Sequence, residues 1–251
     1  MKHHLTIITG ASRGLGLAMA AQLLASGATV LCISRNTSNE LAQRAQQTGA
    51  SLEQWPMDLA DSTVVASALS AWLQTKAHSP WHSVTLINNA GVISTLAPLH
   101  EGQSAELANA LRVGLEAPML LSAAFLGATR DWKIPRKVLN ISSGLGRRAM
   151  ASSASYCAAK AGMDHFTRSM ALDEAGVENG ARVCSLAPGV IDTDMQVQLR
   201  GADESLFPDM ATFRGLHTQG QLSSATDTAS KVLAYLKRPD FGSQPVADIR
   251  D

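Results

Sequence analysis

Residues 5–25 read LTIITGASRGLGLAMAAQLLA, and this stretch decides the fold. Leu5 to Thr9 is a short apolar, β-rich run, typical of a buried parallel strand. Glycines at 10, 14 and 16 then form a turn, and residues 15–25 have helical composition and periodicity. Glycine lets the backbone approach a pyrophosphate, and a helix N-terminus favours its negative charge. The stretch therefore predicts a dinucleotide-binding turn, although its glycine spacing matches the general GxGxxG fingerprint only loosely.

The rest of the chain continues this alternation of strands and helices. Further strands are expected at 28–33, 52–55, 84–87, 137–142, 182–186 and 245–249, and helices at 39–47, 62–75, 104–128 (interrupted by Pro118), 152–175 and 225–236. Unbroken alternation predicts an α/β fold of Rossmann type: one doubly wound parallel sheet of about seven strands, with helices on both faces. We expect a single domain over 1–251. Residues 194–224 are polar and mixed, and we interpret them as a substrate lid within it.

Composition narrows the range of partners. The 251 residues are 45% apolar and 17% charged, with 21 basic and 21 acidic side chains. A neutral chain of this kind favours neither nucleic acid nor an anionic membrane as partner. Cys32, Cys157 and Cys184 are widely spaced in apolar sequence, which favours free thiols in a reducing compartment over disulfides or metal ligands. No metal site is predicted.

Two apolar stretches resemble targeting segments. MKHH followed by LTIITGA imitates a signal peptide, but Arg13 interrupts the run and no convincing small-residue cleavage site follows. Residues 14–34 carry no charge over a length that could span a membrane, yet glycines at 14, 16 and 27 divide them. We interpret both stretches as parts of a soluble fold and expect a cytoplasmic protein.

Residues 143–160, SGLGRRAMASSASYCAAK, carry the candidate chemistry. Tyr156 and Lys160 are four residues apart, so a helix would place both on one face. A neighbouring cation lowers the pKa of a phenol from its ordinary value near ~10, and such a tyrosine could exchange a proton with a carbonyl or alcohol oxygen. Taken alone, a tyrosine and lysine at this spacing are more often an ordinary surface pair. The neighbouring motifs have to decide between the two.

Two further motifs point to a nucleotide. Ser34-Arg35-Asn36 follows the second predicted strand, where an NAD-binding fold usually places an acid to hold the ribose 2′-hydroxyl. The absent acid, together with Arg35 and Arg13, favours a 2′-phosphate and hence NADP(H); the alternative is a solvated Arg35. Asn88-Asn89-Ala90-Gly91 closes the fourth strand and suits a ligand crevice, although turn capping would select the same residues.

In combination these motifs resemble the short-chain dehydrogenase/reductase family, in order and at its spacings. The shared positions are Thr9-Gly10-xxx-Gly14-x-Gly16, Asp58, Asn88-Asn89-Ala90-Gly91, Ser143, Tyr156-xxx-Lys160 and Pro188-Gly189. The resemblance implies that Ser143 hydrogen-bonds the substrate oxygen and that Tyr156 is the general acid or base. It also implies that Lys160 binds the nicotinamide ribose and lowers the tyrosine pKa. The implied NADP(H) site comprises Gly10, Ser12, Arg13, Gly14, Leu15, Gly16, Arg35, Asn36, Asp58, Leu59, Asn88, Asn89, Ala90, Gly91, Tyr156, Lys160, Pro188, Gly189, Ile191 and Thr193.

One departure from the family pattern concerns the long helix. The family commonly has an asparagine within a V-N-L pattern, completing a proton relay with the lysine, whereas this chain reads Val113-Gly114-Leu115. Gly114 offers no side chain, and glycine within a helix is unfavourable by roughly 1 kcal/mol relative to alanine. Either water fills this place and sustains the relay, or turnover is slow.

Shorter signatures narrow the resemblance to the sepiapterin reductases and bacterial benzil reductases of that family, which reduce one carbonyl of a vicinal diketone with NADPH. These signatures are residues 34–36, 131–133, 188–195 and 248–251. We therefore expect an NADPH-dependent reductase of a small dicarbonyl or aryl ketone. Met150, Met195 and Leu199 would line an apolar substrate pocket or merely pack, and Asp248 would anchor the substrate or remain solvated.

Two other functions stay open from the sequence. The chain could reduce a different ketone, such as a sterol or acyl-carrier ketone, or it could be an NADP(H)-binding sensor with little catalysis. The family typically pairs its two long helices, here 104–128 and 152–175, between subunits. We therefore expect a homodimer or homotetramer.

Overall fold

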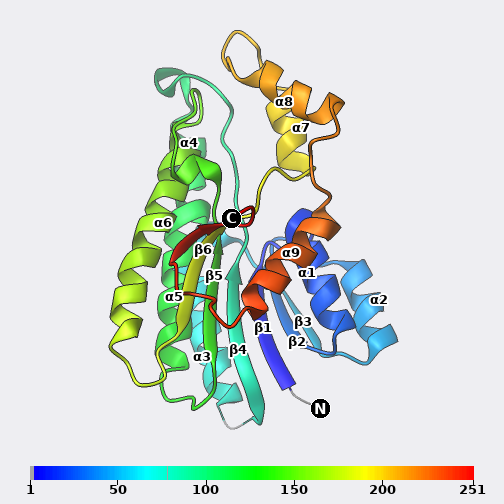
Figure 1. Cartoon of the computed structure of the whole chain (residues 1–251), viewed down its shortest axis with the longest axis vertical. Coiled ribbons are helices and arrows are strands. Elements are labelled where there is room, and N and C mark those ends of the chain that lie inside the picture. The colour runs from blue at the N-terminus through cyan, green and yellow to red at the C-terminus, as the bar shows by residue number, and fades with distance from the viewer. Residues whose placement is uncertain (1–2, 78) are drawn as a thin grey trace.

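The computed structural model describes residues 3–77 and 79–251; Met1 and Lys2, the first residues of the stretch that imitates a signal peptide, lie outside this range. Within it, seven parallel strands form one sheet in the order β3-β2-β1-β4-β5-β6-β7 (Figure 1). They are β1 (His3–Thr9), β2 (Thr29–Ser34), β3 (Leu52–Pro56), β4 (Trp81–Asn88), β5 (Arg136–Ile141), β6 (Arg182–Ala187) and β7 (Val246–Asp248). The predicted doubly wound parallel sheet is confirmed.

The central strands are buried on both faces, as parallel strands under helices must be. Leu5, Ile7 and Ile8 of β1 are fully buried. Their strand pairs with β2 from Leu5↔Thr29 and with β4 from His3↔Trp81, so the carboxyl ends of all three strands reach the same edge. The residues that follow these ends are therefore brought together.

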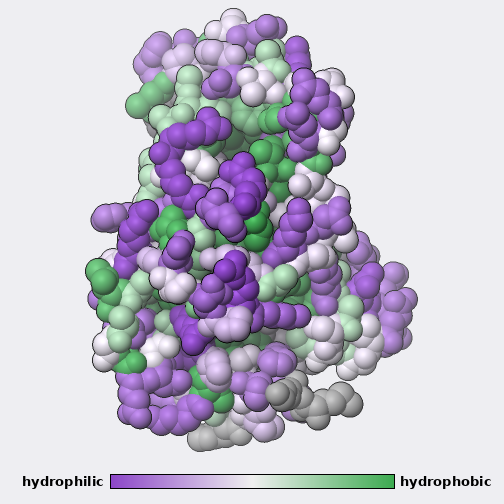
Figure 2. All heavy atoms as spheres, in the orientation of Figure 1, coloured by the Kyte–Doolittle hydropathy of each residue, from purple (hydrophilic) through white to green (hydrophobic). Residues whose placement is uncertain are grey.

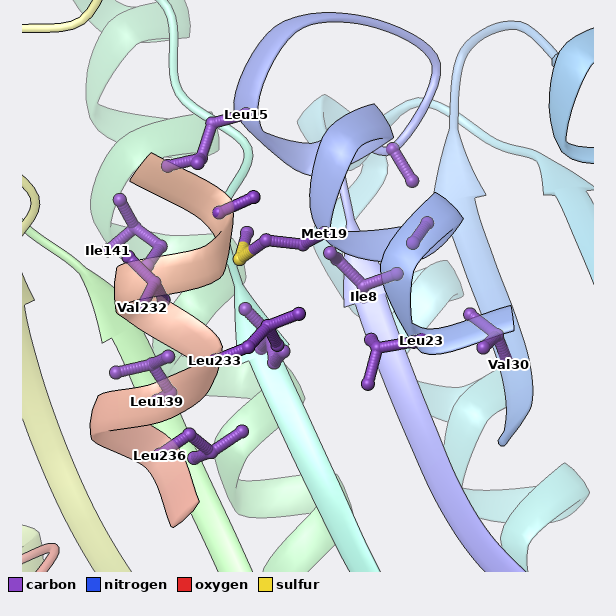
Figure 3. Close-up of a cluster of buried hydrophobic side chains, with 14 of the residues drawn as sticks. Ile8, Leu15, Met19, Leu23, Val30, Leu139, Ile141, Val232, Leu233 and Leu236 are labelled. Atoms are coloured by element: carbon purple, nitrogen blue, oxygen red, sulfur yellow. The ribbon is translucent and has the colours of Figure 1, made fainter. Parts of the chain in front are cut away.

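Helices cover both faces of the sheet (Figure 1). One face carries α1 (Gly14–Ala25), α2 (Asn39–Thr48) and α9 (Ala225–Lys237), and the other carries α3 (Ser62–Lys76), α4 (Ser104–Leu111), α5 (Ala117–Ala128) and α6 (Ala154–Ala175). Figure 3 shows the apolar core under α1 and α9. There Met19 and Leu23 of α1 and Leu233 of α9 pack with Ile8 and Leu139 of the sheet. Single-turn 3-10 helices stand at η1 (Leu59–Asp61), η2 (Leu99–Glu101) and η4 (Gly144–Gly146).

The long helix predicted over 104–128 is continuous but irregular. Between α4 and α5, residues Arg112–Glu116 form a π-helical turn, labelled η3. Pro118 explains it, because proline lacks an amide hydrogen and its ring clashes with the carbonyl four residues earlier; a widened turn relieves the clash. Gly114 lies buried in this turn, and a Cβ there would stand 3.0 Å from the Cβ of Ala159. Glycine thus lets α6 approach closely.

The same stretch is, among the described residues, the one helix long and apolar enough to cross a membrane. It packs between α3 and α6 beside the sheet, as a core helix of a globular protein does.

Residues 194–224, interpreted from the sequence as a substrate lid without any expected helix, contain regular structure. They contain two helices, α7 (Asp194–Arg200) and α8 (Met210–Thr218), which stand above the carboxyl edge of the sheet in Figure 1. Phe207 and Met210 of this segment are buried against Leu96 and Met150 in a small third apolar cluster. The helices escaped prediction because each is short and buries few apolar positions.

Candidate active site

A cavity of about 720 Å³ opens at the carboxyl edge of the sheet. Figure 2 shows apolar side chains interleaved with polar ones over the face below α7 and α8. Most of the predicted cofactor and catalytic residues line this cavity: Gly10, Ser12, Arg13, Gly14, Leu15, Arg35, Asn36, Asp58, Leu59, Asn89, Ala90, Gly91, Ser143, Tyr156, Lys160, Pro188, Gly189, Ile191 and Thr193.

The glycine turn has the geometry that a pyrophosphate requires. Gly10 has a φ of 68°, and a Cβ there would lie 2.9 Å from the Cα of Ala90. A Cβ on Gly16 would collide with the carbonyl oxygen of Gly10. The first turn of α1 contains no acidic residue, and its N-cap, Arg13, makes no side-chain capping bond. Its positive dipole end is therefore open to an anion at the cavity wall.

The end of β2 presents a cation. The hydroxyl of Ser34 accepts a hydrogen bond of 2.8 Å from the amide of Ala11, which joins the end of β2 to the glycine turn. Arg35 follows, exposed and lining the cavity, and has no ion pair among residues 3–77 and 79–251. Arg13, by contrast, forms an ion pair of 2.7 Å with Asp194 of α7. Arg35 is thus an unpaired cation at the end of β2 that fits a phosphate.

Two predicted cofactor residues, Asn88 and Gly16, lie behind the cavity wall. The amide of Asn88 is buried and donates to the Asn140 side-chain oxygen at 2.8 Å and to the Ser122 hydroxyl at 3.1 Å. This residue joins β4 to β5 and α5 where a ligand contact was predicted. Gly16 is a packing glycine, as its contact with Gly10 shows. The sequence pattern is the same for a residue that packs behind the cavity wall and for one that touches the cofactor.

Asn89 and Asp58 do line the cavity, but their side chains also have structural partners. Asn89 donates to the carbonyl oxygen of Thr9 at 3.0 Å, tying the end of β4 to the end of β1. Asp58 accepts from the amide of Ala60 at 2.9 Å and thereby caps η1.

Ser143, Tyr156 and Lys160 meet on one wall. Ser143 follows β5 and caps η4, where its hydroxyl accepts from the amide of Leu145 at 3.2 Å. Tyr156 and Lys160 lie one turn apart on α6, and the Lys160 Nζ atom stands 5.7 Å from the centre of the tyrosine ring. The same Nζ donates to the carbonyl oxygen of Ile141 at 2.7 Å.

Burial dominates the titration of both groups. It raises the pKa of Tyr156 above its ordinary value, while a hydrogen bond with Ser143 acts in the opposite direction. The lowered tyrosine pKa predicted from Lys160 is therefore wrong for this structure, in which the ammonium group binds the Ile141 carbonyl. Burial also lowers the pKa of Lys160 to about 8, and the charge of Asp164 opposes that shift. Both shifts favour the neutral forms.

The predicted substrate residues Met150, Met195, Leu199 and Asp248 all line the cavity. Asp248 is already paired, because its two oxygens accept from the Arg250 guanidinium at 2.7 Å each. Sequence reasoning missed the apolar lining residues Ile93, Leu145 and Phe213 and the polar ones Asn109, Arg148, Gln196 and Arg250. The position of Leu145, two residues after Ser143, was the available signal. The others come from separate helices and loops, and no shared pattern in the sequence joins them.

No cluster of three or more His, Cys, Asp or Glu side chains suited to a metal ion exists among the residues that the structure describes. Cys32, Cys157 and Cys184 are free thiols, and the first and last are buried.

A nucleotide-sized cavity with a serine, a tyrosine and a lysine on one wall defines a dinucleotide-dependent oxidoreductase. The family model for short chain dehydrogenases matches residues 4–204. The chain is 34% identical to a benzil reductase ((S)-benzoin forming) of Bacillus cereus over 94% of each chain, and 31% identical to the sepiapterin reductase of Rattus norvegicus over 98% of this chain and 95% of the relative. The chain therefore belongs to the short-chain dehydrogenase/reductase family, whose cofactors are NAD(P)(H).

Solved structures agree with this assignment. A proposed 2-deoxy-d-gluconate 3-dehydrogenase from Agrobacterium tumefaciens with bound NADP superposes with a TM-score of 0.80 at 25% identity, covering 99% of this chain and 95% of the other. A short-chain dehydrogenase/reductase from Burkholderia vietnamiensis is 33% identical, with a TM-score of 0.67 over 99% of this chain and 97% of the other.

Proposed function

We propose that this protein is an NADPH-dependent carbonyl reductase that acts on a vicinal diketone or a related aryl ketone. The observation that carries the proposal is the convergence of Ser143, Tyr156 and Lys160 on a cavity that also exposes Arg35. The names of the relatives in Bacillus cereus and Rattus norvegicus support the choice of a carbonyl substrate.

Each of the cavity residues would have a separate role in the reduction. A bound reduced nicotinamide would supply the hydride for the carbonyl carbon. The carbonyl oxygen then gains the negative charge, and it needs a donor in the transition state. Ser143 would hydrogen-bond this oxygen and Tyr156 would give it a proton, so that an alcohol is formed. Lys160 would stabilise the phenolate that remains.

The cofactor preference rests on Arg35. An arginine at the end of β2 can bind a phosphate through two parallel hydrogen bonds, whereas a ribose 2′-hydroxyl calls for an acceptor such as a carboxylate. The free guanidinium and the adjacent Asn36 at the cavity wall therefore support NADP(H). Arg13 would join them only by leaving Asp194.

The substrate would enter the apolar side of the cavity. Met150, Leu199 and Phe213 line it, together with Ile93 and Leu145. An apolar wall of this kind suits an aryl or alkyl group beside the reacting carbonyl. Helices α7 and α8 would act as the lid over this space.

The direct test is consumption of NADPH in the presence of benzil or another 1,2-diketone. We expect turnover by the wild-type protein, with Tyr156→Phe slower by about a hundredfold or more. Equal rates in the two proteins would contradict the proposal. Tight NADPH binding with no turnover over a broad panel of ketones would instead favour an NADP(H)-binding sensor.

We also propose that the protein works in the cytoplasm as a homodimer or homotetramer. Free thiols at Cys32, Cys157 and Cys184 suit a reducing compartment. Leu111, Met119 and Leu172 are exposed on α4, α5 and α6, the helices expected at the interface. Sedimentation of the wild type and of Leu172→Lys tests the assembly, and a monomeric wild type would contradict it.

A further inference from the structure

Gln196, in the first turn of α7, lines the cavity with a side-chain amide that the protein leaves without a partner. The residue is only 6% exposed. Its Oε1 atom is buried and accepts no hydrogen bond from the described residues. Its Nε2 atom likewise donates none within residues 3–77 and 79–251. Burying an amide without a hydrogen bond costs free energy, and a buried group of this kind normally has a partner.

The other polar side chains of the cavity differ from Gln196 in being paired or open to solvent. Asp248 accepts from Arg250 with both carboxylate oxygens, and Arg35 and Arg148 are exposed. Several buried side-chain atoms in the described part of the chain have no partner, but of these Gln196 Oε1 alone belongs to a residue that lines the cavity. The cavity is therefore the place from which a partner for this amide can come.

The neighbours of Gln196 place it on the substrate side of the cavity. Met195 and Leu199 flank it on α7 and belong to the third apolar cluster, together with Leu145 and Cys157. Leu145 lies in η4, the turn capped by the proposed catalytic serine, and Cys157 directly follows the proposed catalytic tyrosine. The cluster thus joins this part of α7 to the wall that carries the reacting groups.

A vicinal diketone has a second oxygen that the reaction leaves unused. The reacting oxygen would be bound by Ser143 and Tyr156, as argued above. The oxygen on the adjacent carbon is a further acceptor, and it too loses its water when the substrate enters the cavity. The Nε2 group of a glutamine donates two hydrogen bonds and suits such an oxygen.

We propose that Gln196 is a specificity-determining residue, whose amide nitrogen donates a hydrogen bond to the second, unreacting carbonyl oxygen of a 1,2-dicarbonyl substrate. The proposal rests on the function proposed above and narrows it, because it separates vicinal diketones from isolated ketones. A site built to hydrogen-bond a substrate group discriminates against an analogue that lacks the group, since the buried polar side chain is then left unpaired.

Benzil and deoxybenzoin are matched substrates for the test, because deoxybenzoin has a methylene group in place of one carbonyl. Gln196→Met keeps the length of the side chain and removes the amide. The kcat/KM for benzil should fall about 10–100-fold, and that for deoxybenzoin should change by less than about threefold. Benzil is intrinsically the more reactive ketone, so the change in the benzil-to-deoxybenzoin ratio between wild type and variant is the quantity compared. An unchanged ratio would overturn the proposal.

Gln198→Met is the matched control, with the same substitution two residues further along α7. The Gln198 side chain is exposed and lies outside the cavity lining. Its ratio should equal that of the wild type, and a shift as large as in Gln196→Met would overturn the proposal. Both variants should keep the wild-type dissociation constant for NADPH. If Gln196→Met weakened NADPH binding as much as it slowed the reduction of benzil, Gln196 would belong to the cofactor site and the proposal would fail.

Ligand binding separates this inference from the proposed function. Dissociation constants of benzil and deoxybenzoin are measured by equilibrium dialysis with NADP⁺ bound to the protein. The wild type should bind benzil more tightly than deoxybenzoin, and Gln196→Met should lose most of this preference. This pattern without any turnover would contradict the proposed function and leave the inference standing. Equal affinities in the wild type, or an undiminished preference in the variant, would overturn the inference.

Stability without any ligand gives a second readout that needs no turnover. Gln196→Met removes no hydrogen bond within the protein, so its midpoint of unfolding in urea should lie at or above that of the wild type. A lower midpoint, or a variant that does not fold, would show that the amide is bonded within the protein. Either result would overturn the inference, whether or not the wild type reduces any ketone.

Discussion

Two regions share the carboxyl edge of the sheet, and they are held in place by different forces. Residues 141–164 are fixed from the core, through buried contacts such as Lys160 to Ile141 and Asp164 to Ser142. Residues 194–224 are attached by the exposed Arg13–Asp194 ion pair, by the Arg200–Asp192 pair and by a few apolar side chains. An exposed ion pair contributes about 0–1 kcal/mol, whereas each buried apolar side chain contributes about 1.5–3 kcal/mol. The proton-transfer groups are therefore fixed from within the core, whereas the substrate wall is held by a smaller apolar cluster and by exposed ion pairs.

The most severe test of the rigid region is Lys160→Met. We expect reduction to fall by about a hundredfold or more, because the phenolate loses its cation. Stability should move in the opposite direction. The pKa of Lys160 is lowered to about 8 in the folded protein against an ordinary 10.5, so below pH 8 the folded state carries the cost of a buried charge. Removing that charge should stabilise the protein at pH 7 by about 1–3 kcal/mol.

The sign can be checked by raising the pH. Between about 8 and 10.5 the folded wild type has released the proton while the unfolded chain keeps it, so wild-type stability rises relative to Lys160→Met. The advantage of the variant should shrink over that window. Denaturant unfolding at several pH values measures it, and a variant that is less stable at pH 7 would show that Lys160 contributes to the core.

The second prediction contrasts the free arginine with the paired one. Arg35→Asp should weaken NADPH binding by about 10–100-fold, because a charge-assisted contact to the phosphate is replaced by repulsion, and should spare or improve NADH. Arg13→Ala should weaken it less, since Arg13 is held by Asp194. Dissociation constants for both coenzymes test this. An unchanged preference in Arg35→Asp would remove that residue from the cofactor site.

The same contrast separates what sequence could predict from what it could not. The glycine turn, the seven strands and the wall of Ser143, Tyr156 and Lys160 follow from local patterns, since each strand delivers its next residues to one edge. Asn88 was expected at the ligand but supports the strands, because an amide after a strand serves either purpose. Asp248 was expected to anchor a substrate or remain solvated, yet Arg250 binds it at 2.7 Å. Arg147, about a hundred residues away in the chain, adds a contact of 3.6 Å, and no local pattern records such a contact.

The long helix shows a different limit. Pro118 correctly indicated an interruption, yet the chain accommodates it by a π-helical turn that places Gly114 against α6. The close approach of Gly114 to Ala159 is a tertiary contact, and the local sequence does not record it. Helices α7 and α8 were missed for the related reason that their apolar side chains meet loops instead of the sheet.

The third prediction concerns the tyrosine itself. The chain has two tyrosines, so a Tyr235→Phe background leaves Tyr156 as the one phenol whose ultraviolet titration is observed. In that background the pKa of Tyr156 should lie above its ordinary value of 10.0 without cofactor, because burial outweighs the Ser143 hydrogen bond. Adding Ser143→Ala removes the opposing bond and should raise the pKa further. A value below the ordinary one would show that Lys160 faces the phenol in solution.

The smallest effect is expected in residues 194–224. Asp194→Asn breaks the ion pair with Arg13. The side chains of Arg13 and Asp194 are 68% and 69% exposed, so solvent already screens this pair. The free energy of unfolding should change by less than about 1 kcal/mol. What should change is binding: Arg13, once released, can join Arg35 at a 2′-phosphate, so NADPH affinity should rise modestly, with NADH, which lacks that phosphate, unaffected. The double variant with Arg13→Ala should abolish the gain. A stability loss well above 1 kcal/mol would mean that α7 is held as firmly as the catalytic wall, and the contrast between the two regions would fail.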